Sequence, residues 1–135
     1  TEDCKFALTE TTLGIPPAQI APFVSQRIGL AKARRIMLTA ARFTGKEAHE
    51  MGLADFVAKD ADDLKVIEAD IKKGVLKCAP GANAVTKEIV LATRHLTRKE
   101  MIEFAAKGFA ERMLSDEGKE GISSFIEKRK PEWSK

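Results

Sequence analysis

Glu10 is placed where its carboxylate could transfer protons. It follows a strand-like run, residues 4–8, and precedes a loop rich in turn-forming residues. A carboxyl group held among Leu8, Leu13 and Ile15 would be partly removed from water, and such a group can act as a general acid or base. The alternative, from residue type alone, is a solvated loop glutamate that caps neighbouring amides.

The histidines and cysteines give weaker evidence of a chemical function than Glu10. His49 and His95 have no Cys or carboxylate partner at ligand spacing, so no metal site is predicted. Cys4 and Cys78 form no paired motif, which favours reduced thiols in a cytoplasmic protein. We expect Cys78 to lie in a buried helix stripe.

The composition excludes several classes of protein. The chain has 135 residues, of which 44% are hydrophobic and 32% charged, with a net charge of +3. This balance indicates one globular domain or part of one, rather than disorder. No apolar run approaches the roughly 20 residues that cross a bilayer, so no membrane partner is expected. The basic group Lys32, Arg34 and Arg35 has no interleaved aromatic residues, so no nucleic-acid partner is expected either.

The elements that must position Glu10 begin with the strand at residues 4–8. A helix opening at Pro17 and ending at Gly29 follows, and Pro22 is expected to make its first turn short or kinked. A second helix over residues 30–41 places Ala33, Ile36 and Met37 on one apolar face.

The rest of the chain is predicted to be mainly helical. Thr44 with Glu47, and Thr97 with Glu100, have the spacing of capping boxes. Residues 53–57 are expected to form a brief strand or extended segment. Helices are expected over residues 60–78, 82–96, from 97 onward and from 115 to before Pro131.

These elements lack partners within the chain. A single strand is not stable alone, so we expect upstream sequence or another chain to supply the rest of a sheet. Narrow apolar stripes on the later helices predict association with other copies or with that missing sheet.

Four ordered blocks of sequence resemble the enoyl-CoA hydratase/isomerase (crotonase) superfamily. The first block has the pattern Phe-x-x-x-Glu-x-x-Leu-Gly-x-x-Pro, followed by Arg-Ile-Gly. The second block is Leu-Thr-Ala-Ala-Arg-Phe-Thr, and the third is Met-Gly-Leu-Ala-Asp-Phe-Val. The fourth block has the pattern Glu-Gly-x-x-x-Phe-x-Glu-Lys-Arg-x-Pro-x-Trp. They occupy residues 6–29, 38–44, 51–57 and 120–133.

The resemblance covers the whole chain but only the C-terminal half of a family member. It implies the C-terminal portion of an α/β crotonase-type fold, with about six helices and one or two short strands here. The sheet-rich spiral core, the oxyanion-hole amides and a first catalytic glutamate would lie upstream. Residues 1–57 would end the core, and residues 58–135 would form the helical trimerisation region.

The resemblance also assigns site residues. Glu10 matches the second glutamate of hydratases, which delivers a proton as water adds to the double bond. Leu13, Gly14 and Pro17 would bind the acyl chain. The sequence Pro17-Ala18 replaces a Pro-Gly of many members and is similar to the branched-chain glutaconyl-CoA hydratase group.

A second group would bind the nucleotide end of coenzyme A. Phe125 and Lys128 lie three residues apart, which predicts one shared helix face. In the family an aromatic residue and a lysine at this motif reach the adenine end, often in a neighbouring subunit. The alternative is a core phenylalanine beside the solvated charge run 128–130.

The implied function is water addition to an α,β-unsaturated acyl-CoA, with isomerisation as the variant reaction. No cofactor is expected beyond the coenzyme A of the substrate. The expected partners are the acyl-CoA, the N-terminal half of the enzyme, and further copies in a trimer or dimer of trimers. The isolated chain is expected to be inactive. The alternative is a non-catalytic helical oligomerisation module.

Overall fold

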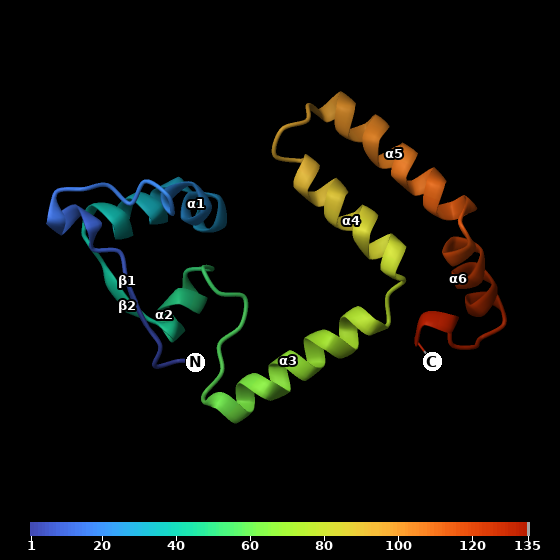
Figure 1. The fold of residues 1–135 in the computed structure, drawn as a ribbon, viewed down its shortest axis with the longest axis horizontal. Helices are drawn as coiled ribbons and strands as arrows, with labels where there is room; N and C mark the ends of the chain where they lie inside the picture. The colour runs from blue at the N-terminus through green and yellow to red at the C-terminus, as the bar shows by residue number, and fades with distance from the viewer. Residues whose placement is uncertain (135) are drawn as a thin grey trace. The chain divides into compact units, whose positions relative to one another are not determined.

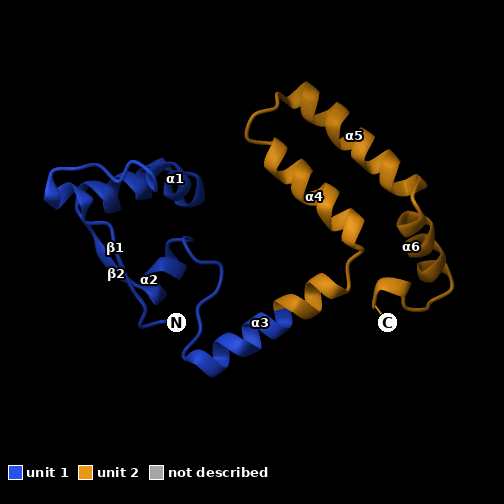
Figure 2. Ribbon diagram, viewed as in Figure 1, with its two compact units in different colours: residues 1–70 blue, residues 71–135 orange. Residues whose placement is uncertain are grey.

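The computed structural model describes residues 1–134, which divide into two compact units between residues 70 and 71 (Figure 2). The described part contains six α-helices and two short strands, as predicted (Figure 1). In chain order the elements are β1 (Lys5–Ala7), the 3₁₀ helix η1 (Glu10–Leu13), α1 (Ala21–Leu38), β2 (Arg42–Thr44), α2 (Gly45–Glu50), α3 (Ala61–Leu76), α4 (Pro80–Ala92), α5 (Arg98–Leu114), α6 (Asp116–Ile126) and the 3₁₀ helix η2 (Glu132–Ser134).

The first unit is organised around an antiparallel pair, β1 and β2. Phe6 lies opposite Phe43 in the register, and their rings stack with centroids 5.4 Å apart. The inner side of this pair packs on α1 and α2. The buried core comprises Leu8, Ile36, Met37, Phe43 and Ala48.

Helix α1 is two helical segments joined at Gly29. The backbone there is non-helical, with φ 77° and ψ 163°, which confirms the break predicted at this residue. The helix begins at Ala21 rather than Pro17, and Pro22 lies in its first turn. A proline costs no hydrogen bond in the first turn, so of the two expectations for Pro22, a short or a kinked first turn, the kink is absent. Ala33, Ile36 and Met37 are buried, as predicted.

Residues 53–57 do not form the expected strand. The Nε–H of Arg27 donates to the carbonyl oxygens of Gly52 and Leu53, each at 3.2 Å, and the guanidinium pairs with Asp55. Arg27 of α1 thus holds the start of this segment, and residues 53–55 form a bend.

Three helices end in the same hydrogen-bonded turn. After α1, α2 and α6 the chain passes through a left-handed residue: Ala40 (φ 51°), Gly52 (φ 85°) and Lys128 (φ 54°). This is the Schellman arrangement, in which the residue after the left-handed one donates back to the helix. The bonds are Ala41 to Ile36 (2.9 Å), Leu53 to Ala48 (2.8 Å) and Arg129 to Ser124 (3.0 Å). A non-glycine residue in this conformation costs about 1–2 kcal/mol.

The second unit contains the hairpin of α4 and α5 (Figure 1). Gly108 permits a close approach, since a Cβ there would lie 2.9 Å from Cγ1 of Val85. Thr97 and Glu100 form the predicted capping box at the start of α5, and Thr44 and Glu47 form the other at α2.

The start of α4 is capped by a different helix. Its N-cap, Ala79, has no side-chain hydrogen bond. Instead the N–H of Gly81 donates to both carboxylate oxygens of Glu117 in α6, at 3.0 and 2.9 Å. The Arg112 guanidinium lies 3.8 Å from the same carboxylate.

Large apolar side chains of the second unit remain exposed. Leu114 is 76% exposed and Ile126 is 71% exposed. Cys78 is also exposed, so the expectation that it lies in a buried stripe is wrong: the neighbouring helix α3 has no buried residue. No helix of the described chain has the length and apolar character required to cross a membrane.

Candidate active-site loop and relationship to known proteins

Glu10 is the first residue of η1, just beyond the end of β1. Two hydrogen bonds fix the chain on either side of it. The N–H of Leu8 donates to the carbonyl of Ala41 at 3.1 Å, and Oγ1 of Thr11 donates to the carbonyl of Met37 at 3.2 Å. Both acceptors belong to the end of α1 and its turn, so the position of Glu10 is set by the core of the first unit.

The Glu10 side chain is half-buried, and one of its oxygens is unusual. Oε2 is inaccessible to solvent and has no hydrogen-bond partner within the protein. Most buried polar atoms are hydrogen-bonded, so an unsatisfied one calls for an explanation, and a catalytic role is one.

The loop after Glu10 is closed by Gly14. This glycine has φ 76° and ψ 15°, and its N–H donates to the carbonyl of Thr11 at 3.3 Å. The N–H of Ile15 donates to the carbonyl of Glu10, also at 3.3 Å. The left-handed conformation at Gly14 is one that glycine adopts without steric cost.

The apolar enclosure predicted for Glu10 is formed only in part. Leu8 is buried, but Leu13 is 75% exposed and Ile15 is 54% exposed. Both lie in the short turn around Gly14, where no other element of the first unit covers them. Their exposed side chains therefore leave an apolar surface on the loop that begins with Glu10.

Pro17 lies at the other end of this loop. It is half-buried, and its carbonyl accepts a hydrogen bond from the N–H of Ala21 at 2.9 Å. Glu10, Leu13, Gly14 and Pro17 thus belong to one segment that connects β1 to α1.

Phe125 and Lys128 belong to the second unit, and the prediction that they share a helix face is wrong. Helix α6 ends at Ile126, and Lys128 lies beyond it in the left-handed turn. The turn was missed because no glycine marks it in the sequence. Phe125 remains at the end of the helix and is 84% exposed.

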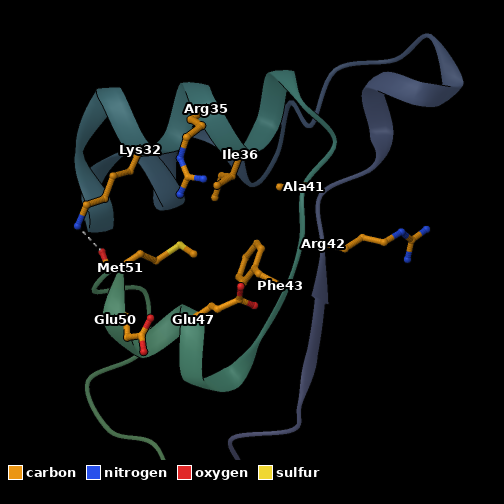
Figure 3. Close-up of a pocket in the computed structure, with 9 residues that line it drawn as sticks. All are labelled: Lys32, Arg35, Ile36, Ala41, Arg42, Phe43, Glu47, Glu50 and Met51. Atoms are coloured by element: carbon orange, nitrogen blue, oxygen red, sulfur yellow. Dashed lines mark hydrogen bonds between the residues drawn. The ribbon is translucent and has the colours of Figure 1, made fainter.

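A pocket of about 370 Å³ in the first unit contains none of the predicted site residues (Figure 3). In Figure 3, Arg35 points from α1 toward the pocket and Arg42 points away from it. Nζ of Lys32 donates to the carbonyl of Met51 at 2.9 Å, and Glu47 is held by the N-cap of α2. The remaining residues that line the pocket are Ile36, Ala41, Phe43 and Glu50. Lys32 and Glu47 therefore make hydrogen bonds at the two ends of α2.

No metal centre is apparent in the described chain. Residues 1–134 hold no group of three or more His, Cys, Asp or Glu side chains arranged to bind a metal ion. Cys4 and Cys78 are both free thiols on the surface.

Sequence reasoning missed two groups of contacts around these sites. The Thr11 hydroxyl holds the Glu10 loop against α1 by donating to the carbonyl of Met37, which lies 26 residues later in the chain. Arg129 binds two carboxylates near Lys128, with its Nη1 2.6 Å from Oε1 of Glu120. The fourth sequence block contains both Glu120 and Arg129, which is the only signal in the sequence that associates them.

The curated proteins that resemble the chain include an enoyl-CoA hydratase and a dienoyl-CoA isomerase. The chain is 34% identical over 134 residues to "Probable enoyl-CoA hydratase" of Bacillus subtilis (strain 168), covering 98% of this chain and 52% of that protein. It is 30% identical over 138 residues to "Delta(3,5)-Delta(2,4)-dienoyl-CoA isomerase, peroxisomal" of Arabidopsis thaliana, covering 99% of this chain and 49% of the relative. The chain thus spans about half the length of these relatives.

Solved structures show the same relationship to this chain as the curated relatives do. Pseudomonas aeruginosa AtuE superposes with a TM-score of 0.96 and 47% identity, over 100% of this chain and 52% of that one. An enoyl-CoA hydratase/isomerase from Marinobacter aquaeolei superposes with a TM-score of 0.92 and 40% identity, over 97% of this chain and 50% of that structure. The matched region is the C-terminal half of the crotonase fold. The family model described as "Enoyl-CoA hydratase/isomerase" matches residues 1–135, and with these likenesses it shows that the chain belongs to the enoyl-CoA hydratase/isomerase (crotonase) superfamily.

Proposed function

We propose that this protein acts on an acyl-CoA thioester, and that the reaction is the addition of water to an α,β-unsaturated acyl-CoA. The chain contributes the acid/base carboxylate, Glu10. Family membership and the names of the relatives, which include an enoyl-CoA hydratase and a dienoyl-CoA isomerase, support an enoyl-CoA substrate. No cofactor other than the coenzyme A of the substrate is required for this chemistry.

One observation carries the assignment to Glu10: its Oε2 is buried and without a hydrogen-bond partner. Hydrogen bonds from Leu8 and Thr11 to the carbonyls of Ala41 and Met37 hold the residues on either side of Glu10, so the main chain that carries the carboxyl group is fixed. A preorganised carboxyl group with one unused oxygen suits proton transfer to a substrate carbon. Water addition requires this proton at Cα, after the hydroxyl adds at Cβ.

The thioester enolate formed in such a reaction needs amide donors for its oxygen. The proposal places those donors, with the first acid/base glutamate, in the part of the relatives that this chain does not span. The exposed Leu13 and Ile15 beside Glu10 are then surfaces for the acyl chain or for that part of the enzyme. Gly14 and Pro17 shape the same loop.

The nucleotide end of coenzyme A is assigned to Phe125 and Lys128. Phe125 exposes most of its ring, and a ring of this kind can stack on adenine. Lys128 is exposed and supplies a cation for a phosphate group. The proposal includes a homo-oligomer, a trimer or a dimer of trimers, in the cytoplasm. Association with other copies would bury the exposed apolar side chains of the second unit.

The test is the Glu10→Gln variant of the full-length protein, assayed for hydration of crotonyl-CoA. The substitution keeps the size of the side chain but removes its acid/base function, so kcat should fall at least about tenfold. The matched control is Glu103→Gln, which changes an exposed carboxylate of α5 in the same way and should leave kcat unchanged. Full activity in Glu10→Gln would remove the catalytic assignment.

The second candidate function is a helical oligomerisation module without catalysis. The exposed Leu114, Phe125 and Ile126 favour it, since they form apolar surface that another chain could cover. The same assay distinguishes the two candidates. A module without catalysis predicts no hydration or isomerisation of enoyl-CoA by the full-length protein, together with stable association.

A further inference from the structure

Arg129 holds the C-terminal segment of the second unit to α6. Its Nη1 and Nη2 donate to the two carboxylate oxygens of Glu120, at 2.6 and 2.8 Å. Its Nε donates to Glu127 at 2.5 Å. Oε1 of Glu120 also accepts the N–H of Glu132 at 3.0 Å. Two parallel bonds to one carboxylate fix the orientation of a guanidinium in a way that a single ion pair does not.

These contacts involve residues on both sides of Lys128 in the chain. Glu127 precedes it, Arg129 follows it, and Glu120 lies two turns earlier on α6. The carboxylates of Glu120 and Glu127 raise the pKa of the Arg129 guanidinium above its usual range. Arg129 therefore pairs with these carboxylates as a full positive charge.

Lys128 adopts a backbone conformation that favours glycine. It has φ 54°, its N–H donates to the carbonyl of Phe125 at 3.3 Å, and the turn is completed by the bond from Arg129 to Ser124. A strained residue persists only where its surroundings determine its conformation, and such residues are concentrated at functional sites. The Lys128 side chain is exposed, so the turn presents its ammonium at the surface.

We propose that Arg129 is a positioning residue, which together with Glu120 holds Lys128 in the left-handed turn from which its ammonium binds the phosphates at the nucleotide end of coenzyme A. This inference rests on the proposed function, because it assumes that coenzyme A is the ligand. It adds a role for Arg129 that acts through Lys128 and does not require contact between Arg129 and the substrate.

The experiment uses two variants of the full-length protein. Arg129→Lys keeps the charge but loses the parallel hydrogen bonds to Glu120. Lys128→Gly removes the cation and relieves the backbone, so the protein should remain folded. The control, Lys119→Gln, removes one positive charge from an exposed site on α6. Affinity for free coenzyme A and for pantetheine, which lacks the nucleotide, is measured by titration calorimetry. Turnover of crotonyl-CoA is measured separately.

Lys128→Gly should weaken binding of coenzyme A about fivefold, and Arg129→Lys should weaken it about twofold to fivefold. The double variant should bind no more weakly than Lys128→Gly, because the two residues act through one contact. Pantetheine affinity should not change in either variant, and KM for crotonyl-CoA should rise by a larger factor than kcat falls. Lys119→Gln should bind coenzyme A like the wild type.

Three results would overturn the inference: additive losses in the double variant, equal losses for coenzyme A and pantetheine, or unchanged affinity for coenzyme A in Arg129→Lys. A protein that binds coenzyme A with the expected variant effects but hydrates no enoyl-CoA would overturn the proposed reaction and support the inference about Arg129.

Discussion

The indole nitrogen of Trp133 donates a hydrogen bond to the main-chain carbonyl of Lys77, at a distance of 3.2 Å. The bond joins η2 to the chain between α3 and α4, 56 residues earlier. The ring also packs against Gly121 of α6, where a Cβ would lie 3.2 Å from Cη2 of the tryptophan. Trp133 therefore connects three segments of the second unit.

Replacing Trp133 by Phe should lower the free energy of unfolding by about 1 kcal/mol, the usual net contribution of a hydrogen bond. The aromatic contact with Gly121 would be retained in part. Urea unfolding of the full chain measures the change. Trp133→Ala, which removes both interactions, should cost more. A Trp133→Phe variant as stable as the wild type would show that the hydrogen bond contributes nothing.

The Schellman turns after α1 and α2 predict stability changes of opposite sign. Ala40→Gly should stabilise the protein by about 0.5–1 kcal/mol, since glycine avoids the steric cost of the left-handed conformation. Gly52→Ala should destabilise the protein by about 1 kcal/mol, because alanine pays the steric cost of the left-handed conformation. Nothing lies within 4 Å of the added Cβ, so this backbone cost is the whole effect. Thermal unfolding measures both. Changes of the same sign in the two variants would contradict this account of the turns.

Arg27 and Asp55 form an ion pair, but Arg27 should contribute more to stability. Arg27 also donates to the carbonyls of Gly52 and Leu53, whereas most of the Asp55 side chain is exposed. We expect a cost of about 1 kcal/mol for Arg27→Ala and at most about 0.5 kcal/mol for Asp55→Ala. Urea unfolding of the two single variants and the double variant compares them. A larger cost for Asp55→Ala would assign the stabilisation to the ion pair.

The two capping boxes predict a loss of stability in acid. Hydrogen bonds from the backbone and hydroxyl of Thr44 lower the pKa of Glu47, and those from the hydroxyl and backbone of Thr97 lower the pKa of Glu100. Because folding lowers both pKa values, the stabilisation is complete above the ordinary glutamate value of 4.5 and is lost as the pH falls through the folded values.

Thermal melts of the wild type and the Thr44→Ala variant between pH 7 and pH 3 test this. The difference in Tm between them should shrink as the pH falls, since protonation of Glu47 weakens the box in the wild type. A constant difference over that range would show that Glu47 does not contribute through its charge.

The features that the sequence predicted correctly depend on nearby residues. The capping box of Thr44 needs only Glu47, three positions later, and the break at Gly29 needs only a residue that tolerates φ of 77°. The buried face of Ala33, Ile36 and Met37 follows from helical periodicity. The family resemblance, which four blocks carried, was confirmed by the match over the whole chain.

The features that were missed depend on distant residues or on missing markers. No local signal relates Arg27 to residues 52–53, so the bend that replaced the expected strand could not be predicted. Lys128 carries no mark of the left-handed turn, because glycine is the usual signal there. The position of Glu10 after a strand was predicted, but not its fixation by the Thr11 hydroxyl.

The capping of α4 by Glu117 has a consequence for folding order. An N-cap side chain normally comes from the residue next to the helix, so that each helix completes its own end. Here the first turn of α4 depends on a carboxylate 36 residues later, which is in place only after α5 has turned back and α6 has begun. A nascent or truncated polypeptide ending before Asp116 would leave the amide of Gly81 without this partner. Assembly of the second unit should therefore be cooperative, with α4 gaining its final protection from hydrogen exchange at the same step as α6.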